Sequence, residues 1–307
     1  MQNKTCTFII PAYIKNLQYL AFLKETLNSI FLQTDNDWNV VIIDDCSPIS
    51  IKNNLNDFDE NKIEIITLNR RETTGYCRNL GIKWAEKNKS KYVLFNDADD
   101  ITDKNRVKRV KDIFKKYAEV DVIYNDIEII DENSLKVRAS KLSKAISEIK
   151  EALKNPPVGK KCWYDIGTKS GYVNITSATS VRLYLAIKEL FPDEYVSEDS
   201  HTWFRYAARG NFYFDRIMIT LYRIPSFVER QSSNYYVDDF NKCKIQVEID
   251  GFNKALDIIF KEKGYEGESR TEIMNKFLLR LKKSMVKVNR YDLVKDLDKR
   301  ILLNSRK

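Results

Sequence analysis

Through its first 130 residues the chain alternates short apolar runs with segments of helical patterning. Apolar residues fill consecutive positions in WNVVIIDD (38–45) and in KYVLFND (91–97), which is the pattern of strands covered on both faces. In the segment 17–33, Leu20, Leu23 and Leu27 recur on one helical face. This alternation predicts βαβ units. We therefore expect an α/β fold with a mostly parallel central sheet flanked by helices.

Three groups of residues, two of them acidic, stand where the predicted strands end. They are Pro11 to Tyr13 after the first strand, Asp44 and Asp45 after the second, and Asp97, Asp99 and Asp100 after the fourth. Ligands of parallel sheets bind outside the carboxyl ends of the strands, so these residues are expected to face one crevice. No GxGxxG or P-loop follows any strand, which argues against hydride transfer and kinase chemistry.

The three acids after YVLF raise the question of what balances their charge. Clustered carboxylates repel and raise each other's pKa unless a cation or hydrogen-bond donors compensate. Mg²⁺ or Mn²⁺ takes one or two protein carboxylates and fills its remaining positions with phosphate oxygens and water. The alternative is that Asp100 or Thr102 caps the following helix. We favour a metal site at Asp97 and Asp99, because a cap needs only one acid.

The later part of the chain predicts helices beyond the sheet. Residues 140–175 are polar and irregular, as in an insertion or substrate loop. Ser197 is expected to cap a helix that Gly210 ends. Helical segments are predicted at about 236–263 and 270–303. We therefore divide the chain into a catalytic domain, 1–230, and a C-terminal helical region, 231–307.

Charge is distributed unevenly along the chain. Residues 270–307 hold 12 of the 52 Lys and Arg but only 4 of the 44 Asp and Glu, so they carry the whole net charge of +8. In this segment an apolar stripe is formed by Ile273, Phe277, Leu278, Leu281 and Met285. We favour a helix packed on the catalytic domain, with contact to an anionic membrane surface as the alternative. No recognition motif for nucleic acid accompanies the charge.

The cysteine spacing and the lengths of the apolar runs indicate the cellular compartment of the protein. The five cysteines are widely spaced and form no CxxC pair, which favours reduced thiols in a cytosolic setting. No stretch approaches the ~20 apolar residues of a membrane span, and the apolar run at the N-terminus is too short for a signal peptide. We expect a cytoplasmic protein, either free or peripheral on the inner face of the cytoplasmic membrane.

Five motifs in order resemble one known family. Strand-PAY, strand-DDCS, GxxRNxG, strand-NDADD and a later SED are similar to the nucleotide-sugar glycosyltransferases of family 2, with the A-type fold, over roughly residues 5–225. The ordered set is specific, whereas no single motif in it is. The resemblance implies a UDP-sugar site that includes Pro11, Ala12, Tyr13, Asp44, Asp45, Arg78, Asp97 and Ala98. In it, Asp45, or alternatively Asp44, holds the uracil or ribose, and Arg78 supports the base end.

The same resemblance implies the catalytic and metal-binding residues. Asp97 lies near the ribose, and Asp99 binds a Mn²⁺ or Mg²⁺ ion that bridges the diphosphate. Asp199, in SED, matches the general base that deprotonates the acceptor hydroxyl, with Glu198 as the fallback. The implied outcome is direct displacement with inversion at the anomeric carbon.

The chain departs from the family pattern at the third metal ligand. Many members carry a histidine after a strand-YR segment, but LYRIPSFVERQSSN contains none. His201, the sole histidine, or water is expected in that place. The loop residues Arg230, Gln231 and Ser232 are candidates for reaching the diphosphate.

Three functions follow as hypotheses. The first is an inverting, metal-dependent glycosyltransferase that transfers a sugar to a hydroxyl of a bacterial surface glycan or glycolipid. The second is a sugar nucleotidyltransferase. Such enzymes usually contain a Gly-rich N-terminal loop with basic residues, and the segment PAYIKNLQ lacks one. The third is a non-catalytic nucleotide-sugar-binding or assembly protein, which would bind UDP and Mn²⁺ without turnover.

Overall fold

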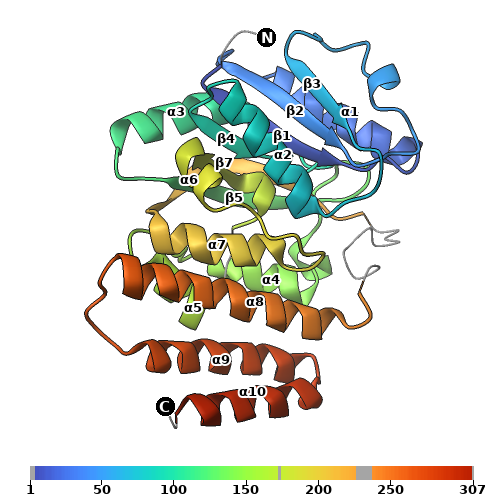
Figure 1. Cartoon of the computed structure of the whole chain (residues 1–307). Helices are drawn as coiled ribbons and strands as arrows, with labels where there is room; N and C mark the ends of the chain where they lie inside the picture. Colours follow the sequence, from blue (N-terminus) through green and yellow to red (C-terminus); the bar gives the residue numbers. More distant parts are fainter. Residues whose placement is uncertain (1–3, 172–173, 226–236, 306–307) are drawn as a thin grey trace.

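The computed structural model describes residues 4–171, 174–225 and 237–305. Its centre is a seven-stranded sheet with the order β3-β2-β1-β4-β6-β5-β7 (Figure 1). The strands are β1 (Cys6–Ala12), β2 (Trp38–Asp44), β3 (Ile63–Thr67), β4 (Tyr92–Phe95), β5 (Val122–Ile130), β6 (Thr179–Arg182) and β7 (Phe212–Arg223). All neighbours pair in parallel except β6, which runs antiparallel to both β4 and β5. The predicted α/β fold with a mostly parallel sheet is confirmed.

Helices cover both faces of the sheet. They are α1 (Leu17–Phe31), α2 (Thr74–Lys87), α3 (Arg106–Lys116), α4 (Lys144–Ala152), α5 (Cys162–Thr168), α6 (Leu183–Lys188), α7 (Glu198–Arg209), α8 (Phe240–Asp257), α9 (Arg270–Lys287) and α10 (Tyr291–Asn304). Short turns lie at η1 (Lys52–Asn54), η2 (Ala139–Lys141) and η3 (Thr176–Ala178), and η5 (Ile258–Glu262) continues α8 as a π-helix. The expected irregular segment at 140–175 therefore contains two helices, α4 and α5.

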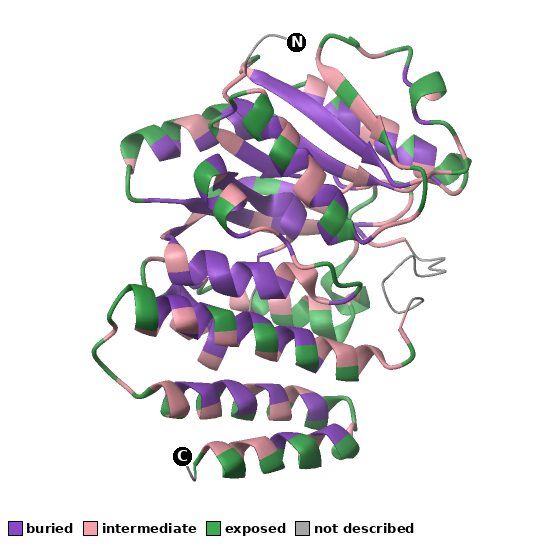
Figure 2. Ribbon diagram, viewed as in Figure 1, coloured by how far each residue is buried: buried purple, intermediate pink, exposed green. Residues whose placement is uncertain are grey.

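Strands β1, β2 and β4 are buried along most of their length, because helices pack against both faces of the sheet (Figure 2). Along β1, Phe8 and Ile10 join the core cluster that includes α1 and α3, whereas Ile9 joins the cluster that includes α2. Gly81 of α2 permits this second contact, since an added Cβ there would lie 2.4 Å from the Ile9 side chain. The continuous apolar runs of the sequence are thus explained by burial on both sides.

The C-terminal helices stack in successive layers below the sheet (Figure 1). Phe252 of α8 and Phe277 of α9 stack with ring centroids 4.2 Å apart, and both rings also contact Phe204 of α7. One apolar cluster runs from the sheet through α7, α8 and α9 to Leu297 of α10. The boundary at 230/231 lies outside the described residues, so the two-part division stays a prediction.

The prediction of a single helix at 270–303 is wrong, because the segment contains a break. The chain forms two helices, α9 and α10, separated at Asn289, whose φ of 58° lies in the left-handed region. Asparagine tolerates this conformation better than most residues. The break lets α10 fold back along α9, so that Leu293 and Leu297 become buried.

The apolar stripe of α9 faces the protein. Ile273, Phe277, Leu278, Leu281 and Met285 are all buried in the core cluster. The favoured alternative, a helix packed on the domain, is therefore what the structure contains, and this stripe is not available to a membrane. None of the helices among the described residues is both long and apolar enough to span a bilayer.

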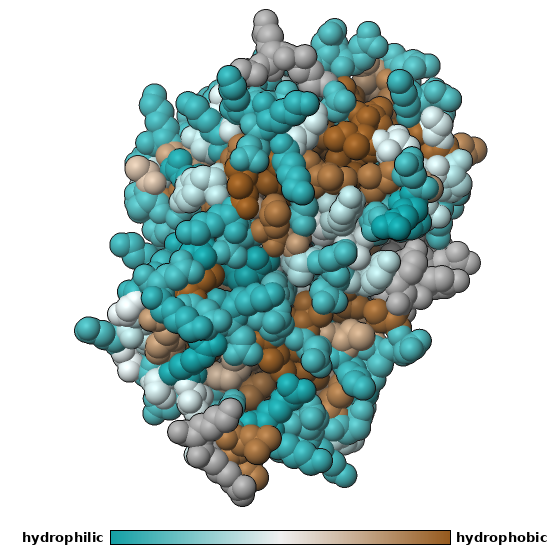
Figure 3. Space-filling model, viewed as in Figure 1, coloured by the Kyte–Doolittle hydropathy of each residue, from teal (hydrophilic) through white to brown (hydrophobic). Residues whose placement is uncertain are grey.

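The basic residues of this region are largely paired. Arg270 pairs with Asp257, Arg280 with Glu248, Lys287 with Glu148, and Arg290 with Asp239. All four acids lie outside α9 and α10. On the face seen in Figure 3, hydrophilic side chains interrupt the hydrophobic ones over this part of the molecule. Four basic residues of the tail thus join α9 and the start of α10 to acids elsewhere in the chain.

Candidate active site

A cavity of about 720 Å³ opens at the carboxyl ends of β1, β2 and β4. The N-terminus of α7 and parts of α4 and α8 complete its walls. Its lining includes ten residues that the sequence singled out for the site: Pro11, Ala12, Tyr13, Asp45, Arg78, Asp97, Ala98, Asp99, Glu198 and Asp199. Asp44 and His201 do not line it. The crossover topology therefore brings together motifs that are far apart in the sequence.

One end of the cavity holds a stacked aromatic and guanidinium pair. Arg71 Cζ lies 3.4 Å from the centre of the Tyr13 ring, and its Nε donates to Asp45 Oδ2 at 2.7 Å. The other Asp45 oxygen accepts from the backbone N–H of Glu72 at 2.7 Å. Burial raises the pKa of Asp45, although these donors oppose the shift. Flat groups beside a carboxylate suit a nucleobase, which stacks on one and donates to the other.

Arg71 was missed in the sequence. It follows the third strand in LNRRETTG, and a basic pair near a strand end was a usable signal. Asp44 turns away from the cavity, because its carboxylate accepts from the Ser47 backbone N–H and from Thr67 Oγ1. Of the two aspartates proposed for the uracil or ribose, only Asp45 is within reach of a ligand.

Arg78 lies between two acids instead of at the base end. Its Nη2 donates to Asp97 Oδ1 at 2.9 Å and its Nη1 to Glu198 Oε1 at 2.8 Å. Burial opposes its charge, but the two carboxylates outweigh burial and raise the pKa of Arg78. Arg78 thus ties the end of β4 to the start of α7, and its expected support of the base end stays a prediction.

The acids after β4 differ in their surroundings. Burial, together with Asp97, raises the pKa of Asp99 to about 7. Asp100 is fully buried, and its Oδ1 accepts from the backbone N–H of Arg223 at 2.8 Å. Asp100 Oδ2 has no hydrogen-bond partner among the described residues, and burial raises the pKa of this carboxyl well above its usual range. Neither Asp100 nor Thr102 caps α3, which begins after Asn105 without a side-chain cap.

These carboxylates fit a divalent cation in number and chemistry. Asp97 and Asp99 both line the cavity, and no ion pair joins Asp99 to a basic side chain in the described part of the chain. Across those residues, no three His, Cys, Asp or Glu side chains are grouped to hold a metal. Two carboxylate ligands are what Mg²⁺ or Mn²⁺ takes when phosphate oxygens and water complete the shell.

His201 is not placed to be a metal ligand. Its Nε2 lies 2.8 Å from Asp250 Oδ2, and its Nδ1 accepts from Arg205 Nε at 3.1 Å. Burial first, and then Arg205, lower the pKa of His201 to about 4. The ring faces α8, so the expectation of a metal-ligating His201 is wrong.

Two acids begin α7 at the cavity wall. Burial raises the pKa of Glu198 to about 7, with the Asp199 charge adding to the shift. Burial also raises the pKa of Asp199, whose Oδ1 accepts from the Ser200 backbone N–H at 2.6 Å. Ser197 does not cap the helix as predicted: its φ is 59° and its side chain makes no capping bond. The turn at Ser197 directs both acids into the cavity.

Helices α4 and α8 contribute residues that no motif indicated. Lys244 lines the cavity and is held by Glu248 Oε1 at 2.5 Å, and Glu248 in turn accepts from Arg280 Nη2 at 3.2 Å. Apolar side chains also line the cavity: Ile146, Ile149, Ile175, Ile224 and Phe240. Their positions depend on packing between distant segments. Arg230, Gln231 and Ser232, expected to reach a diphosphate, lie outside the described residues.

Comparison with known proteins identifies the family. The family model "Glycosyl transferase family 2" matches residues 7–174, more than half of the chain. The chain belongs to glycosyl transferase family 2. This family-2 chain is 24% identical over 135 residues to the E. coli UDP-Glc:alpha-D-GlcNAc-diphosphoundecaprenol beta-1,3-glucosyltransferase WfgD. It is 29% identical over 127 residues to an uncharacterized glycosyltransferase, alr2836, of Nostoc sp.. These matches cover 44% and 40% of this chain, and 50% and 38% of the relatives' own lengths.

Solved structures confirm the A-type fold of this family-2 member. S. aureus TarS 1-349 in complex with UDP-GlcNAc is similar with a TM-score of 0.57 at 17% identity, over 97% of this chain and 89% of that chain. The mannosyltransferase PcManGT from Pyrobaculum calidifontis, in complex with GDP-Man and Mn2+, is similar with a TM-score of 0.53 at 13% identity. That match covers 99% of this chain and 85% of the other.

Proposed function

We propose that the protein is an inverting glycosyltransferase that uses Mn²⁺ or Mg²⁺. It would move a hexose or N-acetylhexosamine from a UDP-sugar to a hydroxyl of a bacterial surface glycan, such as lipooligosaccharide or capsule. The observation that carries this proposal is the meeting of Asp45, Asp97, Asp99 and Asp199 in one cavity at the ends of three parallel strands. The membership in family 2 supports it.

The donor would lie along the polar side of the cavity. Tyr13 and Arg71 offer faces for the uracil, and Asp45 offers a carboxylate to its N–H or to the ribose. Asp99, with Asp97, would hold the cation, which neutralises the charge that develops on the diphosphate leaving group. Arg78 would keep Asp97 in place from the protein side.

Asp199 is the proposed general base. A sugar hydroxyl is a poor nucleophile, and a positioned carboxylate that takes its proton speeds the attack. Burial raises the pKa of Asp199 and so makes it a stronger base than an exposed aspartate. Glu198 is less suited, because Arg78 occupies its Oε1. A base on the acceptor side, opposite the leaving diphosphate, implies inversion at the anomeric carbon.

The acceptor would lie against α4 and α8. There the apolar side chains and Lys244 suit a molecule with both apolar and anionic parts. The E. coli relative is named for transfer to a diphosphoundecaprenol-linked GlcNAc, which supports a glycolipid acceptor. The five free cysteines support a cytoplasmic site of action.

The decisive experiment combines a donor screen with one substitution. UDP release is measured for a panel of UDP-sugars with Mn²⁺, with Mg²⁺ and with EDTA. We expect one donor to be hydrolysed or transferred, and EDTA to abolish the signal. Asp199→Asn is expected to lower the rate by about 100-fold or more, the typical contribution of general base catalysis, while the UDP dissociation constant stays the same.

Asp112→Asn is the matched control, because Asp112 is exposed on α3 and pairs with the exposed Lys108. It should leave the rate unchanged. Full activity in Asp199→Asn would refute the assigned base. Binding of UDP and Mn²⁺ without turnover of any donor would instead support a non-catalytic binding protein.

A further inference from the structure

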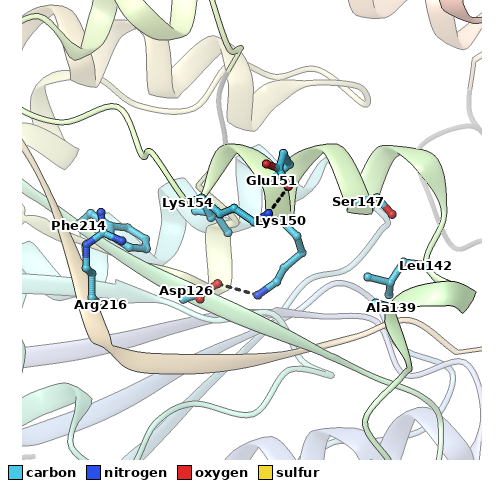
Figure 4. Close-up of a pocket in the computed structure, with 10 residues that line it drawn as sticks. Asp126, Ala139, Leu142, Ser147, Lys150, Glu151, Lys154, Phe214 and Arg216 are labelled. Atoms are coloured by element: carbon cyan, nitrogen blue, oxygen red, sulfur yellow. Dashed lines mark hydrogen bonds and ion pairs between the residues drawn. The ribbon is translucent and has the colours of Figure 1, made fainter.

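A second cavity, of about 510 Å³, lies between α4 and the strands β5 and β7 (Figure 4). Its volume falls in the range of roughly 300–1,000 Å³ that small-molecule sites occupy. Asp126 enters from β5, Phe214 and Arg216 from β7, and Ser147 and Lys150 from α4. The proposed glycosyltransferase function uses none of these residues.

Helix α4 separates this second cavity from the candidate active site. Ile146 and Ile149 of α4 line the active-site cavity, whereas Ser147 and Lys150 line the second one. Adjacent positions of a helix point about 100° apart, so one helix can serve two cavities. A ligand in the second cavity would therefore lie roughly one helix diameter, ~10 Å, from the first.

Two of the three basic side chains that line the second cavity form ion pairs, and Arg216 is the third. Lys150 Nζ lies 2.9 Å from Asp126 Oδ1, and Lys154 Nζ lies 2.5 Å from Glu151 Oε2 (Figure 4). Arg216 forms no ion pair within the described ranges. Its guanidinium lies over the Phe214 ring, with Cζ 5.4 Å from the ring centre. The exposed guanidinium is thus available to an anion.

An irregularity in the sheet places Arg216. Asn125 pairs with Asp215, but the next residue of β5, Asp126, pairs with Ile219, so that residues 216–218 bulge out of the ladder. Such bulges redirect side chains and are common next to binding sites. Here the bulge puts Arg216 at the cavity, beside Phe214 of the same strand.

The side chains that line the second cavity indicate which chemical groups a ligand there would carry. A guanidinium binds carboxylate or phosphate through two parallel hydrogen bonds. Asp126, Ser147 and Lys150 offer donors and acceptors for hydroxyl groups. Leu142 and the Phe214 ring offer apolar surface for the C–H face of a sugar ring. We propose that the second cavity binds a saccharide that carries a carboxylate or phosphate group, with Arg216 as its anion contact.

The test compares two sugars that differ in one group. Glucuronate and glucose share a ring, but only glucuronate has a carboxylate. Dissociation constants are measured on the full chain by saturation-transfer NMR, with and without UDP. We expect glucuronate to bind about tenfold more tightly than glucose, as the loss of one charge-assisted contact implies. In Arg216→Gln this preference should disappear, whereas in Arg300→Gln, a partly exposed arginine on α10 that pairs with Asp296, it should remain.

A second variant tests for the sugar part of the site. Ser147→Phe places a larger side chain at the cavity wall without removing Arg216 and should weaken the binding of both sugars. Inorganic phosphate is the competitor that separates a sugar site from a simple anion site. Equal glucuronate binding in the wild type and Arg216→Gln would overturn the proposal. It would also be overturned if phosphate bound as tightly as glucuronate and Ser147→Phe had no effect. Asp199→Asn should not affect either result, so this test is independent of the catalytic proposal.

Discussion

Arg78 shows how one side chain can organise a cluster of acids. Its guanidinium joins Asp97, at the end of β4, to Glu198, at the start of α7. These residues are 101 positions apart in the chain, and the arginine between them is almost fully buried. A buried arginine can remain charged when two carboxylates flank it. Arg78 thereby holds the candidate metal-binding segment and the candidate base in register.

Burial favours the neutral form of His201, whereas Arg78 keeps its charge. It is buried, it contacts Arg205 of its own helix, and Asp250 and Lys254 face it from α8. Arg205 and Lys254 oppose a positive charge on the ring and Asp250 favours one, but burial is the largest influence. The imidazole is therefore neutral at physiological pH.

We predict that His201 makes stability depend on pH. Its folded pKa of about 4 is below the ordinary value of 6.5, so between these values the unfolded chain binds a proton that the folded chain does not. The free energy of unfolding should therefore fall as the pH is lowered, by about 1 kcal/mol between about pH 7.5 and 5.5. Urea unfolding at several pH values measures this contribution as the difference between the wild type and His201→Gln. Because there is one histidine, a single imidazole NMR signal reports its pKa, and a midpoint near 6.5 would contradict the prediction.

At the scale of elements, helices α7 and α8 approach each other through a glycine. A Cβ added at Gly251 would lie 2.6 Å from the Cα of His201. Backbone cannot move away as a flexible side chain can, so the close approach requires the absence of a side chain. The contact also sets the position of α8, whose first turns carry Phe240 and Lys244 to the candidate active site.

Gly251→Ala is predicted to destabilise the protein. Alanine would favour the helix by about 1 kcal/mol, but the overlap with His201 should outweigh this and give a net loss of about 1–3 kcal/mol. Urea unfolding checks the value. Gln246→Ala is the control, because Gln246 is exposed on the same helix and should change stability little. A stability equal to or above that of the wild type would show that α7 and α8 can separate freely.

At the scale of the whole molecule, the C-terminal helices share the core of the sheet domain. The same apolar cluster contains Val93 of β4, Trp203 of α7, Phe277 of α9 and Leu297 of α10. Ion pairs from α9 to acids elsewhere in the chain add a second kind of attachment. A shared core predicts that these helices and the sheet unfold together.

Leu297→Ala tests whether the C-terminal helices and the sheet unfold together. Removal of a fully buried leucine side chain should cost about 2–4 kcal/mol. All four tryptophans, Trp38, Trp84, Trp163 and Trp203, lie outside α8–α10, so their fluorescence reports on the rest of the fold. We expect fluorescence and circular dichroism to show the same lowered midpoint. Leu302→Ala, exposed on the same helix, is the control. A fluorescence transition unchanged by Leu297→Ala would show that α10 unfolds alone.

Much of this protein follows from local sequence pattern. Continuous apolar runs predicted the buried strands, helical spacing predicted α1, and the order of strands and helices predicted a mostly parallel sheet. The motifs at the strand ends predicted that Tyr13, Asp45, Asp97 and Asp99 would meet, because parallel strands present their carboxyl ends at one edge. These features depend on residues that are close in sequence or on general rules of topology.

Only the tertiary structure decided which charged groups face one another. Asp44 and Asp45 are indistinguishable by pattern, yet one turns inward to Thr67 and the other lines the cavity. The partners of Arg78 and of His201, and the break at Asn289, likewise come from contacts between segments that are distant in the chain or from the packing of α10 on α9. The physical reason is that side-chain direction and burial depend on what packs opposite each residue, and sequence spacing alone does not contain that information.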